Sequence, residues 1–168
     1  MSNWSNHTQQ SLLDKAYQMV MRGWSVIPLR GMGDPTKPKA PALPSWKVYQ
    51  SHKPRFEELQ EWFIEKGYGA LGVVLGRVSG IVVIDIDKPE IEIAFQTALP
   101  HLANTFTVRS GNRKLPHYYY ALSPDLDAPA RTGHGIEFRS DGQYVVAPTM
   151  VIGESEWRIE NPKIPHTL

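Results

Sequence analysis

The chain has 168 residues, of which 41% are hydrophobic and 21% charged, and this composition excludes a disordered protein. Its 18 basic and 17 acidic residues give a net charge of +1, so contact with a polyanion is expected only at local clusters. Because cysteine is absent, a disulfide scaffold, a thiolate zinc site and a cysteine nucleophile are excluded. No apolar signal core or membrane-length run is present, which predicts a cytoplasmic protein without membrane contact. The length predicts one domain over residues 1–168, with a polar tail at about 1–10.

Two helix–strand units are predicted in the first half of the chain. A helix capped by Ser11 precedes a strand at 24–29, where Pro28 favours an edge position. A second helix at Arg55–Lys66 precedes two apolar strands, at 70–75 and 81–86. From Arg30 to Lys47, between the first strand and the second helix, the chain forms a proline-rich loop with four basic residues and one acidic residue.

Short strands dominate the second half of the chain. A third helix at 89–99 is followed by strand patterns at 105–108, 117–121, 136–139 and 144–147. Asp141-Gly142 is a strong two-residue turn signal, so a β-hairpin is expected between the last two strands. The pattern predicts an α+β domain with a largely antiparallel sheet and helices packed on it.

Acidic side chains from separate strands are predicted to share one face of this sheet. Because side chains alternate along a strand, Asp85 and Asp87 point to the same side, as do Glu137 and Arg139. His117 adds an imidazole from a third strand. Neighbouring carboxylates repel one another unless a cation lies between them, and Mg²⁺ or Mn²⁺ prefers oxygen ligands. The pattern therefore indicates two metal ions and a triphosphate, with the polar outer face of a half-solvated sheet as the alternative.

The order of these motifs resembles the primase–polymerase (Prim-Pol) family of the archaeo-eukaryotic primase superfamily. The matching pieces are Val83-Ile84-Asp85-Ile86-Asp87, Ser110-Gly111 through His117, Gly135-Ile136-Glu137-Phe138-Arg139-Ser140-Asp141-Gly142-Gln143-Tyr144-Val145-Val146-Ala147-Pro148, and upstream Arg22 to Leu29. The resemblance covers residues 12–159 and implies an RRM-like sheet with an added N-terminal helix–strand unit. The loop from Ser110 to His117 is longer than the family's approach to its histidine.

The resemblance implies a DNA primase and polymerase, a nucleotidyltransferase that joins dNTPs or NTPs to a 3′-hydroxyl with release of pyrophosphate. It implies that Asp85, Asp87 and Glu137 hold Mg²⁺ or Mn²⁺ and that His117 contacts the nucleotide phosphates. Further nucleotide contacts are expected from Arg139, Ser110 and Arg113. DNA contacts are expected from Lys37, Lys39, Lys114 and Tyr119.

Two other functions fit the same residues. A non-catalytic single-stranded-DNA-binding module would use Tyr119 and the basic loops, whereas a metal-dependent phosphodiesterase would use the acids to degrade DNA. A P-loop ATPase, a zinc hydrolase and a rolling-circle nicking enzyme are disfavoured because their motifs are absent. The expected partners are a single-stranded DNA template, a nucleotide and a replicative helicase, supplied separately or on a further C-terminal region. The expected setting is DNA replication in a mobile element.

Overall fold

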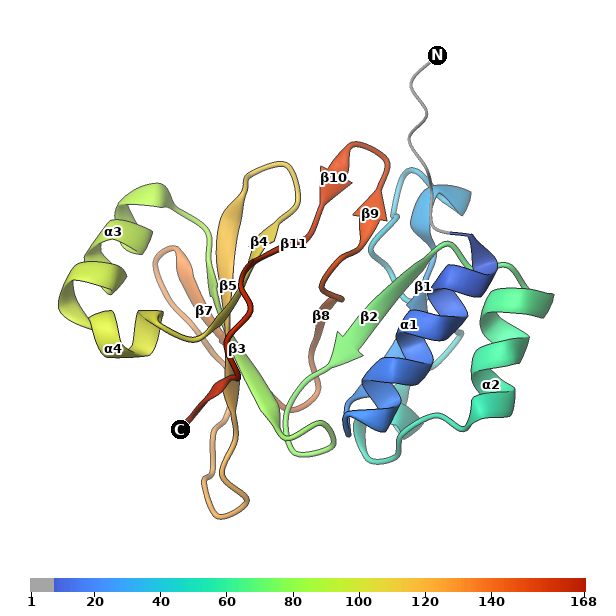
Figure 1. Ribbon diagram of the computed structural model, residues 1–168, viewed down its shortest axis with the longest axis horizontal. Coiled ribbons are helices and arrows are strands. Elements are labelled where there is room, and N and C mark those ends of the chain that lie inside the picture. The colour runs from blue at the N-terminus through green and yellow to red at the C-terminus, as the bar shows by residue number, and fades with distance from the viewer. Residues whose placement is uncertain (1–7) are drawn as a thin grey trace.

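Two main antiparallel sheets, rather than one, organise the computed structural model, which describes residues 8–168 (Figure 1). The smaller sheet has the order β1–β2–β8, formed by Ser25–Leu29, Ala70–Val74 and Tyr144–Val146. Pro28 lies in β1 at the edge of this sheet, as predicted, because an edge strand needs only half of its backbone N–H groups for pairing. A separate two-stranded unit pairs β9 (Val151–Ile152) with β10 (Ser155–Glu156).

The larger sheet has the strand order β11–β4–β5–β3–β7–β6, with the short strand β12 paired to β5. Its strands are β3 (Ile81–Ile86), β4 (Phe106–Ser110), β5 (Leu115–Ala121), β6 (Arg131–Thr132), β7 (Ile136–Arg139), β11 (Arg158–Asn161) and β12 (His166–Thr167). All of these pairings are antiparallel except that of β12 with β5. The mixture of helices and antiparallel sheet confirms the α+β class. An RRM-like topology and a single domain stay predictions.

Helices cover the outer side of each sheet (Figure 1). The smaller sheet carries α1 (Gln9–Met21) and α2 (Phe56–Gln60), and α2 continues as a π-helical turn over Glu61–Glu65. The larger sheet carries α3 (Pro89–Ala98) and α4 (Pro100–Ala103). Within residues 8–168, none of the helices is long and apolar enough to cross a membrane.

The first helix begins one turn earlier than predicted. Thr8 has extended backbone angles, and its Oγ1 accepts a hydrogen bond from the backbone N–H of Ser11 at 3.1 Å. Ser11 is therefore inside the helix, and the prediction that it caps the helix is wrong. Glutamine is a good helix former, so Gln9 and Gln10 extend the helix into the predicted polar tail. Residues 1–7 of that tail lie outside the described part of the chain.

The hairpin predicted at Asp141-Gly142 does not form. Strand β7 pairs with β3 in the larger sheet, whereas β8 pairs with β2 in the smaller one. The turn therefore carries the chain from one sheet to the other. Asp141 Oδ1 accepts a hydrogen bond from the backbone N–H of Arg77 at 2.8 Å, which anchors the crossing to the β2–β3 connection. The local turn signal is overridden because each strand pairs with a buried partner.

Side-chain alternation along β3 divides the hydrophobic core into two clusters. Val82 and Ile86 pack with Phe95 of α3 on the outer face of the larger sheet. Val83, on the inner face, joins the cluster that contains the smaller sheet and α1. Asp85 follows Val83 on that same inner face. The inner face is thus apolar at one end and carries carboxylates at the other.

Candidate active site

Hydrogen-bond register brings three of the predicted site residues together. Asp85 in β3 lies directly opposite His117 in β5 and directly opposite Glu137 in β7. Side chains at directly opposed positions of an antiparallel pair lie on the same face, with Cβ atoms roughly 5 Å apart. The sheet therefore presents an imidazole and two carboxylates side by side on its inner face.

Arg139 joins the two carboxylates. Its Nε lies 2.9 Å from Asp85 Oδ2 and its Nη2 lies 2.8 Å from Glu137 Oε2. The Nε contact is not aligned as a hydrogen bond, so it is mainly an electrostatic attraction. On the other side of Asp85, its Oδ1 lies 3.3 Å from His117 Nε2. Asp85 is thus held between two basic side chains.

These neighbours determine the charge state of Asp85. Burial of this carboxyl group would by itself raise its pKa, because water stabilises the charged form. Hydrogen bonding and charge from His117, together with the charge of Arg139, outweigh that effect and hold the pKa of Asp85 below its ordinary value. Asp85 is therefore ionised at neutral pH, although its side chain is only 10% exposed.

The loop between β4 and β5 forms the next part of the site. Arg113 Nη1 lies 3.8 Å from Asp87 Oδ1, and both side chains are substantially exposed. Exposed pairs of this kind contribute little to stability, so the guanidinium is free to bind another anion. Ser110 also faces this region, but its hydroxyl donates a hydrogen bond to the carbonyl oxygen of Leu115 at 3.0 Å.

A cavity of about 720 Å³ lies over these residues. This volume is within the range of small-molecule sites. Seven of the predicted residues line it: Lys39, Asp85, Asp87, Ser110, Arg113, His117 and Arg139. Glu137 does not line the cavity, but it pairs with Arg139, which does.

Aromatic residues that the sequence interpretation missed form another part of the cavity wall. Trp46 and Tyr144 meet edge to face with ring centroids 5.3 Å apart, and both line the cavity with Trp157. Lys39 places its Nζ 5.1 Å from the Trp157 ring centroid. The Tyr144 hydroxyl donates to the carbonyl oxygen of Lys39 at 3.0 Å, which holds the proline-rich loop against the smaller sheet. In the sequence, these wall residues could have been suspected from the aromatic residues of the proline-rich loop and of the Asp-Gly-x-Tyr segment.

The remaining predicted DNA contacts lie elsewhere. Lys37 and Lys114 are exposed and are not among the residues that line the cavity. Tyr119 is fully buried and stacks on Trp24 with ring centroids 6.2 Å apart. A buried ring cannot stack on a base, so the prediction that Tyr119 contacts DNA is wrong. Tyr119 lies on the same face of β5 as His117, but its part of that face is covered by the apolar core, whereas His117 reaches the cavity.

Replacing Tyr119 with phenylalanine tests this correction. The Tyr119 hydroxyl is buried without a hydrogen-bond partner, and burial together with the charge of Asp85 raises its pKa. Removal of an unpaired buried hydroxyl is expected to leave the free energy of unfolding unchanged or to increase it by about 1 kcal/mol. Urea denaturation and DNA titration would measure stability and affinity. A large loss of DNA affinity in a stable Y119F variant would contradict the assignment of Tyr119 to the core.

The chemistry of the acidic residues fits a divalent cation, but their present arrangement is closed by Arg139. Asp85, Glu137 and Asp87 supply carboxylate oxygens, which Mg²⁺ and Mn²⁺ prefer. The Arg139 guanidinium lies between Asp85 and Glu137 and supplies the positive charge there. In the described range, 8–168, no group of three acidic or histidine side chains is close enough to hold a metal ion as it stands.

Comparison with known proteins gives one family match. The family described as "Bifunctional DNA primase/polymerase, N-terminal" (Prim-Pol) matches residues 16–166. The matched segment includes the smaller sheet, the larger sheet as far as His166 of β12, the acidic face and the cavity. A search of curated proteins found no match.

Proposed function

Because the chain belongs to the bifunctional DNA primase/polymerase (Prim-Pol) family, we propose that it transfers nucleotides to a 3′-hydroxyl under the direction of a single-stranded DNA template. The proposal includes the start of new chains without a primer. The observation that carries it is the ionised, buried Asp85, which lies opposite His117 and Glu137 at the edge of the cavity.

We assign Asp85, Asp87 and Glu137 as the residues that would hold Mg²⁺ or Mn²⁺. A bound divalent ion would stabilise negative charge that develops on the transferring phosphate and on the leaving pyrophosphate. The strand register supports this assignment for Asp85 and Glu137, since adjacent strands hold their backbones at fixed separation. Asp87 lies just after β3 and is free to turn, because it is exposed and pairs only loosely with Arg113.

The basic residues of the cavity are proposed to bind the triphosphate. Arg139 can turn from Asp85 to a phosphate group, because its Nε contact with Asp85 is not aligned as a hydrogen bond, and a phosphate oxygen would then compete with Glu137 for its Nη2. His117 Nδ1 is buried without a partner, so this ring nitrogen has a free hydrogen-bonding capacity at the site. Arg113 and Lys39 add positive charge at other points of the wall. A triphosphate would satisfy these groups together.

The alternative of a non-catalytic DNA-binding module loses support in the structure. It relied on Tyr119 as a stacking residue, and that ring is fully buried. A cluster of ionised groups around a buried carboxylate is also characteristic of catalytic sites, where such groups are arranged at a cost in stability. The phosphodiesterase alternative uses the same acidic residues, so only a test of the reaction products distinguishes it from a polymerase.

The deciding experiment is incubation with an unprimed single-stranded template, labelled dNTPs or NTPs, and Mg²⁺ or Mn²⁺. A primase–polymerase would yield labelled chains and pyrophosphate that depend on the template and the metal ion. A phosphodiesterase would shorten a labelled template, and a binding module would retain the template without either product. Absence of chains and pyrophosphate under every combination, with template still bound, would overturn the proposed activity.

A further inference from the structure

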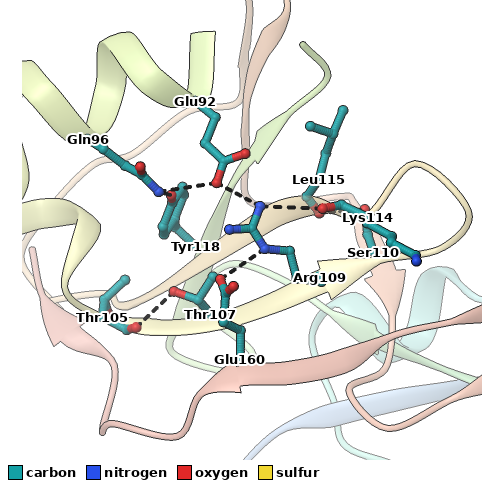
Figure 2. Close-up of polar contacts among 10 residues, drawn as sticks. All are labelled: Glu92, Gln96, Thr105, Thr107, Arg109, Ser110, Lys114, Leu115, Tyr118 and Glu160. Carbon is teal, nitrogen blue, oxygen red and sulfur yellow. Dashed lines mark hydrogen bonds and ion pairs between the residues drawn. The ribbon is translucent and has the colours of Figure 1, made fainter. Parts of the chain in front are cut away.

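Arg109 forms the centre of an ion-pair network on the side of the larger sheet that faces α3 (Figure 2). Its Nη1 lies 2.6 Å from Glu92 Oε1 of α3, and its Nε lies 2.9 Å from Glu160 Oε2 of β11. The Arg109 side chain is only 20% exposed. The pair with Glu92, whose side chain is also largely buried, is therefore less screened by water than an ordinary surface pair, whereas Glu160 is about half exposed. The network connects α3, β4 and β11.

The same guanidinium also contacts the loop that follows β4. Arg109 Nη1 donates a hydrogen bond to the backbone carbonyl oxygen of Lys114 at 3.3 Å (Figure 2). Lys114 has a φ angle of 54°, in the left-handed region that side-chain-bearing residues rarely adopt. A residue in this conformation persists when the surrounding structure holds it there. The Arg109 contact is one such restraint.

The opposite side of this loop faces the cavity. Arg113 immediately precedes Lys114, lines the cavity and lies 3.8 Å from Asp87. Gly111 and Asn112 line the same wall. Lys114, whose carbonyl oxygen Arg109 holds, is thus the residue next to Arg113, which is proposed to bind phosphate.

We propose that Arg109 is a positioning residue, which holds the β4–β5 loop so that Arg113 is directed toward the triphosphate. This inference rests on the proposed function, because it assigns a role in binding the nucleotide of that reaction. Arg109 acts from the far side of the sheet and is not among the residues that line the cavity.

Neighbouring residues hold Glu92, the carboxylate with which Arg109 pairs. Glu92 Oε1 accepts a hydrogen bond from Gln96 Nε2 at 3.1 Å, and Gln96 Nε2 also lies 3.0 Å from the hydroxyl of Tyr118 in β5 (Figure 2). The carboxylate that receives Arg109 is therefore itself held by the helix and the sheet. A planar guanidinium can reach Glu92, Glu160 and the carbonyl oxygen of Lys114 at once, which a lysine ammonium cannot do with the same geometry.

The test compares Arg109→Gln with Arg113→Gln and with the double variant, using KM for dNTP, kcat and thermal unfolding. Each single variant is expected to raise KM roughly tenfold with a much smaller change in kcat, since one charge-assisted phosphate contact is lost or misplaced. The double variant is expected to resemble Arg113→Gln alone, because Arg109 acts through Arg113. Arg131→Gln is the matched control, because exposed Arg131 in β6 does not line the cavity and donates a hydrogen bond to the carbonyl oxygen of the adjacent Ala130, and it should keep the wild-type KM.

Outcomes of this comparison separate the inference from the proposed function. A wild-type protein that neither binds dNTP nor incorporates it would overturn both. An active wild type with an unchanged KM in Arg109→Gln, or with independent effects in the double variant, would overturn only the role of Arg109. If Arg109→Gln does not fold, Glu92→Gln replaces it, since this variant weakens the anchor and keeps the pair with Glu160. Glu92→Gln should raise KM roughly threefold, and an unchanged KM would again contradict the inference.

Discussion

Replacement of Asp85 by asparagine is expected to lower nucleotide incorporation by about 1,000-fold, because several kcal/mol of transition-state stabilisation by a bound cation would be lost. Asparagine keeps the shape of the side chain but removes the negative charge that faces Arg139 and His117. The free energy of unfolding is expected to fall by only about 1–2 kcal/mol, since Arg139 keeps Glu137 as a partner. Incorporation of labelled dNTP and urea denaturation would measure the two effects on the same preparation.

A matched control for this variant is Asp125→Asn. Asp125 is an exposed aspartate in the turn region after β5, and it does not line the cavity. Its replacement removes the same charge and should leave incorporation at the wild-type rate. Retention of more than about a tenth of wild-type activity by folded D85N would show that Asp85 is not required for the chemistry.

Gly76→Ala is expected to cause the largest loss of stability, about 3 kcal/mol. Gly76 follows β2 and has a φ angle of 87°, which disfavours any residue with a Cβ atom. A Cβ atom at Gly76 would also lie 2.7 Å from the Cα of Asp141. That backbone belongs to the crossing between the two sheets, so relief of the clash would displace Asp141 from its hydrogen bond with Arg77. Urea denaturation would give the change in the free energy of unfolding.

The Gly80→Ala variant separates the cost of the clash with Asp141 from the cost of the positive φ angle. Gly80 lies in the same connection and has a φ angle of 62°, but a Cβ atom there would meet nothing within 4 Å. This variant should lose only about 1–2 kcal/mol, the cost of a left-handed residue. Equal losses in the two variants would mean that the contact between Gly76 and Asp141 does not limit stability.

Regular periodicity explains which parts of the fold could be predicted from sequence. The apolar run of β3 and the alternation of Asp85 with Ile84 and Ile86 predicted both the strand and its polar face, because these depend on neighbours along one chain segment. The helix predicted at 89–99 from its proline start is observed at Pro89–Ala98. The fold class followed from the order of these elements.

Long-range pairing explains what could not be predicted. An Asp-Gly turn looks the same whether its flanking strands pair with each other or with distant strands, so the crossing at Asp141 was mistaken for a hairpin. Alternation placed Tyr119 on the same face as His117, but the strand alone does not show where the cluster that contains the smaller sheet and α1 covers that face. The bridge from Arg139 to Asp85 and Glu137 likewise depends on the register of β7 beside β3.

The most direct test of the central claim is a titration of Mn²⁺, with free ion measured from its electron paramagnetic resonance signal. Wild-type protein is expected to reduce the free Mn²⁺ signal, whereas D85N and Glu137→Gln should leave more of it free and Asp125→Asn should match the wild type. Equal binding by the wild type and the D85N and E137Q variants, or no binding by the wild type, would contradict a cation site at the carboxylates bridged by Arg139.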